Sequence, residues 1–266
     1  MELRDKVVVV TGGASGIGTG LCRRFREEGV RGLVIADLNG DAASELAAEL
    51  DGTSYALDVR DESAIAAMVA QTEAEFGQID LFCSNAGILN LDGDDYWATS
   101  SNNDVWQKNW EVHVMAHIYA ARACLPEMIE RKAGYFLVTA SAAGLLAALG
   151  SGPYTVTKAA AIKLAEFIAI TYGDDGIGVS VLCPQGVNTA MAPRSLGDGQ
   201  TDGVIEPNVL ADHVIVALRE ELFHVLPHPE VDDYVRRKGD NIDRWLGGMR
   251  RLRRRSVGSA SHTSPE

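Results

Sequence analysis

Three side chains of this sequence could together move a proton to or from a small molecule. Tyr154 and Lys158 are four residues apart and would share one face of a helix. A phenol has a pKa near ~10, and a nearby ammonium lowers that pKa by favouring the phenolate. Ser141 precedes Tyr154 by thirteen residues and could hydrogen-bond the same substrate oxygen. The trio indicates general acid and base catalysis, although a tyrosine and a lysine at this spacing are also common on helix surfaces.

A glycine-rich turn, TGGASGIG (11–18), follows the apolar run KVVVV (6–10). Glycines allow a tight turn and let a pyrophosphate approach the backbone, while the amide groups of a following helix face the anion. The spacing of Gly12, Gly16 and Gly18 differs from G-x-G-x-x-G, and a plain tight turn would also explain it. The turn therefore predicts a nucleotide site only in combination with other features.

Asp37 is such a feature, because it ends the second apolar run, 19 residues after Gly18. A carboxylate at this place can bond the hydroxyls of an adenosine ribose and would repel a 2′-phosphate. No lysine or arginine lies in the glycine turn or directly after Asp37. The pattern favours NAD over NADP. The alternative is that Asp37 caps the next helix, a role that Asn39 could take instead.

Short apolar runs rich in β-branched residues alternate with helical patterns along the chain. Strands are predicted at 6–11, 32–37, 53–58, 79–87, 134–141 and 178–184, and helices at 20–29, 41–50, 62–77, 104–131 and 153–172. Continuous apolar strands indicate burial on both faces. The fold class is therefore α/β, with a single Rossmann-type doubly wound parallel sheet and helices on both faces.

Residues 1–255 are expected to form one dinucleotide-binding and catalytic domain, with a disordered tail at 256–266. Within that domain, 188–206 is predicted as a substrate loop and 228–255 as a C-terminal helical extension. LFHVL (222–226) is the candidate last strand. The helix expected after it, with Tyr234, Trp245 and Leu246, could cover the site or pack against a neighbouring subunit.

Composition narrows the class of partner. The 266 residues carry a net charge of −13, which disfavours nucleic acid. MRRLRRR (249–255) goes against this trend and is interpreted as a solvated helix end, with a nucleic-acid or membrane tail as the alternative. Four scattered cysteines, a start without a signal-peptide pattern and no long apolar run predict a cytoplasmic protein without a membrane span. His224 and His228 lack accompanying ligands, so no metal site is predicted.

Taken together, these features resemble the short-chain dehydrogenase/reductase family over roughly residues 3–192. The resemblance is carried by TGGASGIG, Asp37, LDV (57–59), NAG (85–87), Ser141 ahead of YTVTK (154–158), and CPQGVNTAM (183–191). Each piece alone is degenerate, but their order and spacing are specific. The resemblance implies an NAD-dependent alcohol dehydrogenase or carbonyl reductase, with Tyr154 as acid and base.

The resemblance also implies roles for individual residues. Lys158 would tune the pKa of Tyr154, and Ser141 would position the substrate oxygen. Asp58 would bond the adenine amine, with Val59 against the ring. The implied cofactor-binding residues are Gly12, Ser15, Gly16, Ile17, Gly18, Asp37, Leu38, Asp58, Val59, Asn85, Ala86, Gly87, Tyr154, Lys158, Pro184, Gly186, Val187 and Thr189.

One position departs from the family pattern. Members usually carry an asparagine in the helix after NAG, which helps to hold a water that links the lysine to solvent, but WEVHVMAH (110–117) places His113 there. An imidazole titrates near neutrality and could serve this relay, so His113 is a fourth candidate catalytic residue. It could also block the water, or Asn109 could take a shifted role. The alternative function is therefore an NAD-binding protein of low catalytic activity, a sensor or scaffold.

The predicted substrate segments, 144–152 and 187–196, are mainly apolar. Their candidate pocket residues are Leu146, Leu149, Met191 and Leu196, and Arg194 is the only cation in these two segments. A small, uncharged, hydrophobic secondary alcohol or ketone is the expected substrate. The family resemblance also implies a homotetramer or homodimer, with helices 104–131 and 153–172 at the interfaces.

Overall fold

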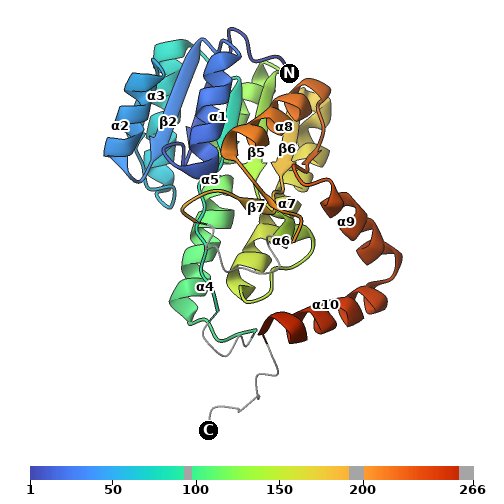
Figure 1. Cartoon of the computed structure of the whole chain (residues 1–266). Coiled ribbons are helices and arrows are strands. Elements are labelled where there is room, and N and C mark those ends of the chain that lie inside the picture. The colour runs from blue at the N-terminus through green and yellow to red at the C-terminus, as the bar shows by residue number, and fades with distance from the viewer. Residues whose placement is uncertain (93–97, 192–200, 258–266) are drawn as a thin grey trace.

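A parallel sheet of seven strands forms the centre of the computed structural model, which describes residues 1–92, 98–191 and 201–257 (Figure 1). The strands are β1 (Val7–Thr11), β2 (Gly32–Asp37), β3 (Thr53–Ala56), β4 (Leu81–Ser84), β5 (Gly134–Thr139), β6 (Ile177–Leu182) and β9 (His224–Val225). Their order is β3-β2-β1-β4-β5-β6-β9, and every neighbouring pair is parallel. The predicted doubly wound sheet is confirmed, and β9 lies within the candidate last strand, LFHVL.

Helices cover both faces of this sheet. The first layer holds α1 (Gly16–Glu27), α2 (Gly40–Glu49) and α8 (Pro207–Glu220), and the second holds α3 (Glu62–Phe76), α5 (Ala116–Glu130) and α7 (Gly152–Tyr172). Side chains of β1 alternate between the two layers, with Val8 and Val10 packed into the first core and Val9 into the second. Burial on both faces explains why the strands are continuously apolar in sequence.

The helix predicted over 104–131 is interrupted. It consists of α4 (Asn103–Trp110), a π-helical turn (Glu111–Met115) and α5, so that His113 lies at the centre of the wider turn. Single π turns inside α-helices recur at functional sites. The helix predicted over 20–29 begins earlier, at Gly16, and the last glycines of the glycine turn therefore belong to its first turn. Two helices, α8 and the short α6 (Ala142–Leu145), had no counterpart among the predicted elements.

The C-terminal extension contains two helices where one was expected. α9 (Glu230–Asp240) and α10 (Ile242–Val257) are separated at Asn241, whose backbone is extended. Tyr234 therefore lies on α9, and Trp245 and Leu246 lie on α10. Figure 1 shows these helices, called the C-terminal arm below, projecting from the body. The predicted tail beyond residue 257 lies outside the described residues.

Two short strands bracket the predicted substrate loop. β7 (Gly186–Val187) pairs in parallel with β8 (Val204–Ile205), which brings the two ends of 188–206 together. Among the helices that the structure describes, none is both long enough and apolar enough to span a bilayer. Residues 192–200 of the loop lie outside the described ranges.

The contact between α1 and α8 gives a test of the fold. A β-carbon at Gly20 would lie 2.6 Å from the carbonyl oxygen of Pro207, so Gly20→Ala is expected to lower the free energy of unfolding by about 1–3 kcal/mol in urea denaturation. Gly239→Ala is the matched control, because nothing lies within 4 Å of the added methyl group. Since alanine has the higher helix propensity, this variant should be more stable than the native protein by up to about 1 kcal/mol. Equal effects of the two changes would contradict this packing.

Candidate active site

A large cavity opens at the carboxyl ends of the strands, where the order reverses between β1 and β4. Ligands of open parallel sheets bind at this kind of switch point. The cavity measures about 1140 Å³, above the usual range of about 300–1000 Å³ for one small ligand. Every residue that the sequence predicted to bind the cofactor lines it, as do Ser141, Leu146, Leu149 and Met191. Leu196 lies outside the described residues.

The glycine turn presents bare backbone to this cavity. A β-carbon at Gly18 would lie 2.0 Å from the carbonyl oxygen of Gly12, so only glycine permits this close turn. Ser15, at the start of α1, makes no capping hydrogen bond, and the first turn of α1 contains no acidic residue. The first N–H groups of α1 are therefore not capped by these side chains, and a helix N-terminus of this kind attracts an anion. These residues fit a dinucleotide pyrophosphate.

Asp37 holds the glycine turn in place. Its carboxylate accepts hydrogen bonds from the backbone N–H of Ala14 (3.1 Å) and of Asn39 (3.0 Å). Asn39, not Asp37, caps α2 through a bond from the backbone N–H of Ala42 (3.2 Å). The capping alternative for Asp37 is thus wrong. Leu38, beside it in the cavity wall, is 74% exposed and offers an apolar surface to a ligand.

Asp58 has a partner that the sequence analysis missed. Arg60 lies two residues later and pairs with its carboxylate at 2.6 Å, and both side chains line the cavity. The hydrogen bond from Arg60 lowers the pKa of Asp58 below its usual value. Two residues so close in sequence can form a salt bridge only where the chain turns, as it does after β3. The sequence analysis did not predict that turn.

Tyr154, Ser141 and Lys158 converge as predicted. Ser141 follows β5 and lines the cavity together with Tyr154, which lies in the first turn of α7. Lys158 lies one turn further along α7 and is 3% exposed. Its ammonium donates to the carbonyl oxygen of Thr139 at 2.8 Å and lies 5.7 Å from the centre of the Tyr154 ring. The backbone at the end of β5 thus holds the Lys158 ammonium close to the Tyr154 ring.

The pKa values of this pair differ from the expectation. Burial raises the pKa of Tyr154, and its hydrogen bond with Ser141 opposes that rise only partly. Burial also lowers the pKa of Lys158 to about 8, because an ammonium loses hydration away from water. The predicted lowering of the Tyr154 pKa by Lys158 is therefore wrong. The phenol is protonated at neutral pH and is ready to donate.

His113 lies behind the cavity wall and is fully buried. Its Nε2 accepts a hydrogen bond from the backbone N–H of Ile88 at 3.0 Å, so the ring proton must reside on Nδ1. Nδ1 lies 2.9 Å from Oγ1 of Thr157, whose hydroxyl donates onward to the carbonyl oxygen of Pro153 at 2.7 Å. Burial lowers the pKa of His113 well below its usual value, and the charge of Lys158 adds to that effect.

These contacts make His113 a neutral bridge. The imidazole joins the loop after the NAG turn to α7, and its ring meets that of Tyr154 edge to face, with 5.5 Å between ring centres. Both ring nitrogens are engaged, so neither is free to carry a proton between Lys158 and solvent. The amide nitrogen of Asn109 donates to Oδ1 of Asn90 at 2.9 Å and to the carbonyl oxygen of Val105 at 2.8 Å, whereas its Oδ1 is buried without a hydrogen-bond partner among the described residues.

A second buried histidine lies one turn further along. Nδ1 of His117 is 2.6 Å from the hydroxyl of Ser84 at the end of β4, and its Nε2 is buried without a hydrogen-bond partner among the described residues. Burial lowers the pKa of His117 to about 3. Asn85, the next residue after Ser84, ties β1 to β5 by donating to the carbonyl oxygen of Thr11 and accepting from the hydroxyl of Thr139, both at 3.0 Å.

The C-terminal arm closes the far end of the cavity. The predicted covering residues Tyr234 and Trp245 line it, whereas Leu246 is exposed and does not. Further residues of the arm were missed as lining residues: Arg237, Asp240, Asn241, Arg244, Gly248, Met249, Arg251 and Leu252. The spacing of Trp245, Met249 and Leu252 was the available signal, since residues three and four apart share a helix face.

Comparisons with known proteins agree with this geometry. Residues 6–198 match the family model described as short chain dehydrogenase. The chain is 32% identical over 257 residues to 1-deoxy-11-beta-hydroxypentalenate dehydrogenase of Streptomyces exfoliatus, which covers 92% of this chain and 91% of the relative. It is 35% identical over 196 residues to 3beta-hydroxysteroid dehydrogenase 2 of Eggerthella lenta, covering 70% of this chain and 73% of the relative.

A solved structure adds the cofactor-bound form of a relative. The structure of a short chain dehydrogenase/reductase from Burkholderia phymatum in complex with NAD superposes with a TM-score of 0.83. The two chains are 25% identical, and the match covers 91% of this chain and 96% of that one.

The two buried histidines predict acid sensitivity. Each stays neutral in the folded protein but binds a proton in the unfolded chain below about pH 6.5, so stability falls as the pH drops below that value. Each histidine should contribute a slope of about 1.4 kcal/mol per pH unit. Urea denaturation of His113→Asn between pH 6 and pH 5 should show a slope smaller by that amount. An unchanged slope would mean that His113 is charged in the folded protein.

Proposed function

Because the chain belongs to the short-chain dehydrogenase family, an oxidoreductase family, we propose that it is an NAD-dependent alcohol dehydrogenase or carbonyl reductase. Its substrate would be a hydrophobic secondary alcohol or the matching ketone. The observation that carries the proposal is the meeting of Ser141, Tyr154 and Lys158 in the same cavity as the uncapped start of α1. One end of the cavity suits a dinucleotide, and the other presents a proton donor.

The chain's own residues would hold NAD along one wall. The N–H groups at the start of α1 would bind the pyrophosphate, and Asp37 the adenosine ribose, with Leu38 and Val59 against the adenine. Asn85, Ala86 and Gly87 would lie beside the riboses, and Pro184, Gly186, Val187 and Thr189 would hold the nicotinamide end. When bound, NAD supplies the carbon that takes up or gives back the hydride.

The proton chemistry would belong to Tyr154. In ketone reduction its protonated phenol donates to the substrate oxygen, and in alcohol oxidation the phenolate takes the proton back. Ser141 would orient that oxygen, since it lines the same cavity as the phenol. The Lys158 ammonium would stabilise the phenolate as it forms, because a positive charge in a site shielded from water favours the nearby anion.

The relatives support the substrate class. The names of two relatives describe dehydrogenases of a hydroxypentalenate and of 3beta-hydroxysteroids. In this chain, Leu146, Leu149, Met191 and Trp245 line the cavity and give its substrate end an apolar surface. Apolar walls with a few placed polar groups are typical of sites for small hydrophobic ligands.

A second candidate function is an NAD-binding protein of low catalytic activity, acting as a sensor or scaffold. One observation favours it: both nitrogens of His113 are engaged, so the side chain gives no free group to a proton relay. Rapid turnover by the native protein would exclude this candidate. Activity that appears only in His113→Asn would support it.

We also propose a cytoplasmic homotetramer or homodimer. Phe167 and Ile170 on α7 are 67% and 74% exposed, on one of the helices expected at the interface. Apolar side chains gathered on one helix are typical of surfaces that bury themselves against another chain.

The Tyr154 hydroxyl gives the direct test of the dehydrogenase function. NADH formation from NAD should be followed over a panel of hydrophobic secondary alcohols, with the native protein beside Tyr154→Phe. The variant should lose at least about a hundredfold in turnover, because it lacks the proton acceptor, yet bind NADH as the native protein does. A variant with native turnover would contradict the assigned role.

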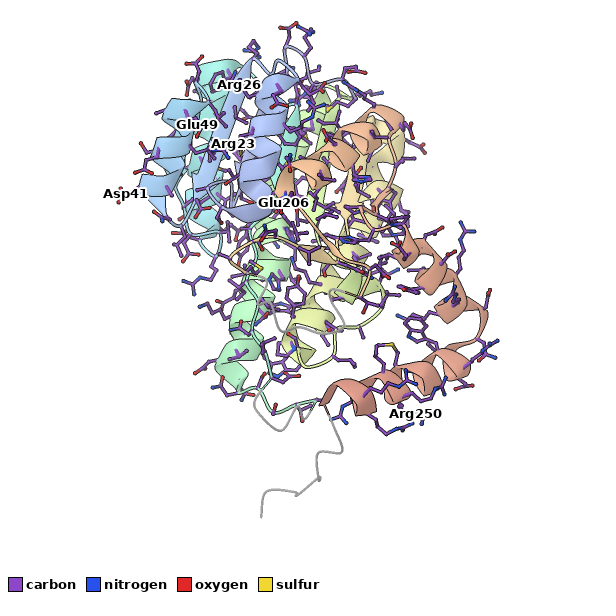
Figure 2. The ribbon with its side chains drawn as sticks, viewed as in Figure 1. Arg23, Arg26, Asp41, Glu49, Glu206 and Arg250 are labelled. Atoms are coloured by element: carbon purple, nitrogen blue, oxygen red, sulfur yellow. The ribbon has the colours of Figure 1, made fainter. Side chains whose placement is uncertain are left out.

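Asp37 gives the test of cofactor preference. The native protein should bind NADH at least about tenfold more tightly than NADPH, because the carboxylate repels a 2′-phosphate. Asp37→Asn keeps an oxygen for the Ala14 N–H and should reduce this ratio. Asp41→Asn is the control, since Asp41 lies on the outer side of α2, away from the cavity (Figure 2). Equal binding of NADH and NADPH by the native protein would overturn the preference for NAD.

A further inference from the structure

The C-terminal arm brings positive charge to the substrate end of the cavity. Arg237 on α9 and Arg244 and Arg251 on α10 line the same cavity as Tyr154. Arg244 and Arg251 are seven residues apart, two helical turns, and so lie on one face of α10. The expectation of an uncharged substrate was built on the segments 144–152 and 187–196 and did not include these arginines.

The same face of α10 is also its apolar face. Trp245, Met249 and Leu252 line the cavity between and beside the two arginines. A surface helix usually directs its cations to solvent, away from its apolar stripe. Arg250 does not line this cavity; it lines a separate, smaller one with Leu246 and Met249, and its side chain lies on the outer side of α10 (Figure 2). The face of α10 that lines the site thus combines charge and apolar surface.

These arginines have no carboxylate partner. In the described part of the chain, Arg23, Arg24 and Arg60 each form an ion pair, but none of Arg237, Arg244 and Arg251 does. Asp240 is the one carboxylate that the described part of the arm adds to the cavity wall. In a chain of net charge −13, three unpaired cations around one apolar opening leave a local positive field.

Hydrogen bonds from α9 connect the C-terminal arm to the body of the protein. The ammonium of Lys238 on α9 donates to the carbonyl oxygens of Leu145 (2.5 Å) and Leu146 (3.4 Å), at the end of the short helix that Ser141 caps. The hydroxyl of Tyr234 also donates to Asp202 at 3.0 Å. Two segments of the body therefore hold α9, and the ring of Tyr234 meets that of Trp245 on α10, with 6.4 Å between ring centres.

We propose that the substrate is an organic acid: an apolar body that carries the reacting hydroxyl or keto group at one end and a carboxylate at the other. Arg244 and Arg251, with Arg237 beside them, bind the carboxylate, because a guanidinium offers paired N–H donors that match its two oxygens. The apolar residues between them cover the body of the molecule. This inference rests on the proposed function, and it names the substrate class for that same site.

The test compares a carboxylate with a neutral molecule of the same shape. Binding of 4-cyclohexylbutanoate and of 4-cyclohexylbutanamide to the NADH-loaded protein is measured by calorimetry. We expect the carboxylate to bind about tenfold more tightly than the amide. The double variant Arg244→Gln/Arg251→Gln should lose that preference and keep its affinity for the amide. Arg250→Gln, with the same change of charge on the other face, should keep the preference.

Equal binding of the two compounds, or binding of neither, would overturn the inference, as would a preference that survives in the double variant. An alkyl phosphate with the same ring is the third ligand, and tighter binding of the phosphate than of the carboxylate would overturn the carboxylate assignment. NADH binding and the Tyr154→Phe comparison are separate readouts. A native protein that does not bind NADH would contradict the proposed function. The same titrations with the carboxylate and the amide, made without NADH, would then still decide the inference.

Discussion

A neutral imidazole between the loop after the NAG turn and α7 is the interaction on which the geometry of the site depends. His113 accepts from the backbone N–H of Ile88 and donates to Thr157, which lies between Tyr154 and Lys158 on α7. Each of these hydrogen bonds pairs a buried polar group. Leaving such a group without a partner lowers the free energy of unfolding by about 1–3 kcal/mol. The π turn at Glu111–Met115 places the ring between these two segments. His113 thus contributes to the registry of loop and helix, together with the bonds from Ser151 to the carbonyl oxygen of Asn90 and from the backbone N–H of Gly152 to Asp92.

The remaining contacts of the site build on that registry. Thr139 at the end of β5 receives the Lys158 ammonium on its carbonyl oxygen and donates its hydroxyl to Asn85. A buried ammonium that has lost most of its hydration is costly, and the fall of its pKa to about 8 reflects that cost. The cation remains mostly protonated at neutral pH. It lies within 6 Å of the ring whose oxygen would become anionic, so the cost is offset only when the phenolate forms.

The sequence was sufficient for the sheet and for one wall of the cavity, because both depend on local patterns. Buried strands are apolar throughout, and a turn that approaches a pyrophosphate needs glycine. Other features depend on contacts between distant segments. His113 meets partners 25 residues before it and 44 residues after it, so its neutral state followed only from the fold. The place of α9 likewise depends on contacts of Lys238 and Tyr234 with distant segments. The split of the arm has a local cause that the sequence analysis missed, because the side-chain oxygen of Asn241 accepts from the backbone N–H of Arg244 and caps α10. Helix propensity also does not distinguish a π turn from an α turn, so 104–131 was predicted as one helix.

The tautomer of His113 is the property that decides whether this bridge exists. Long-range ¹H–¹⁵N spectra of histidine-labelled protein, assigned by comparison with His113→Asn, report the protonation of each ring nitrogen. We expect a neutral ring with the proton on Nδ1 and no proton on Nε2, unchanged between pH 8 and pH 6.5. An imidazolium at pH 7, or a neutral ring with its proton on Nε2, would contradict it, since the Ile88 N–H would then have no acceptor and the bridge would not exist.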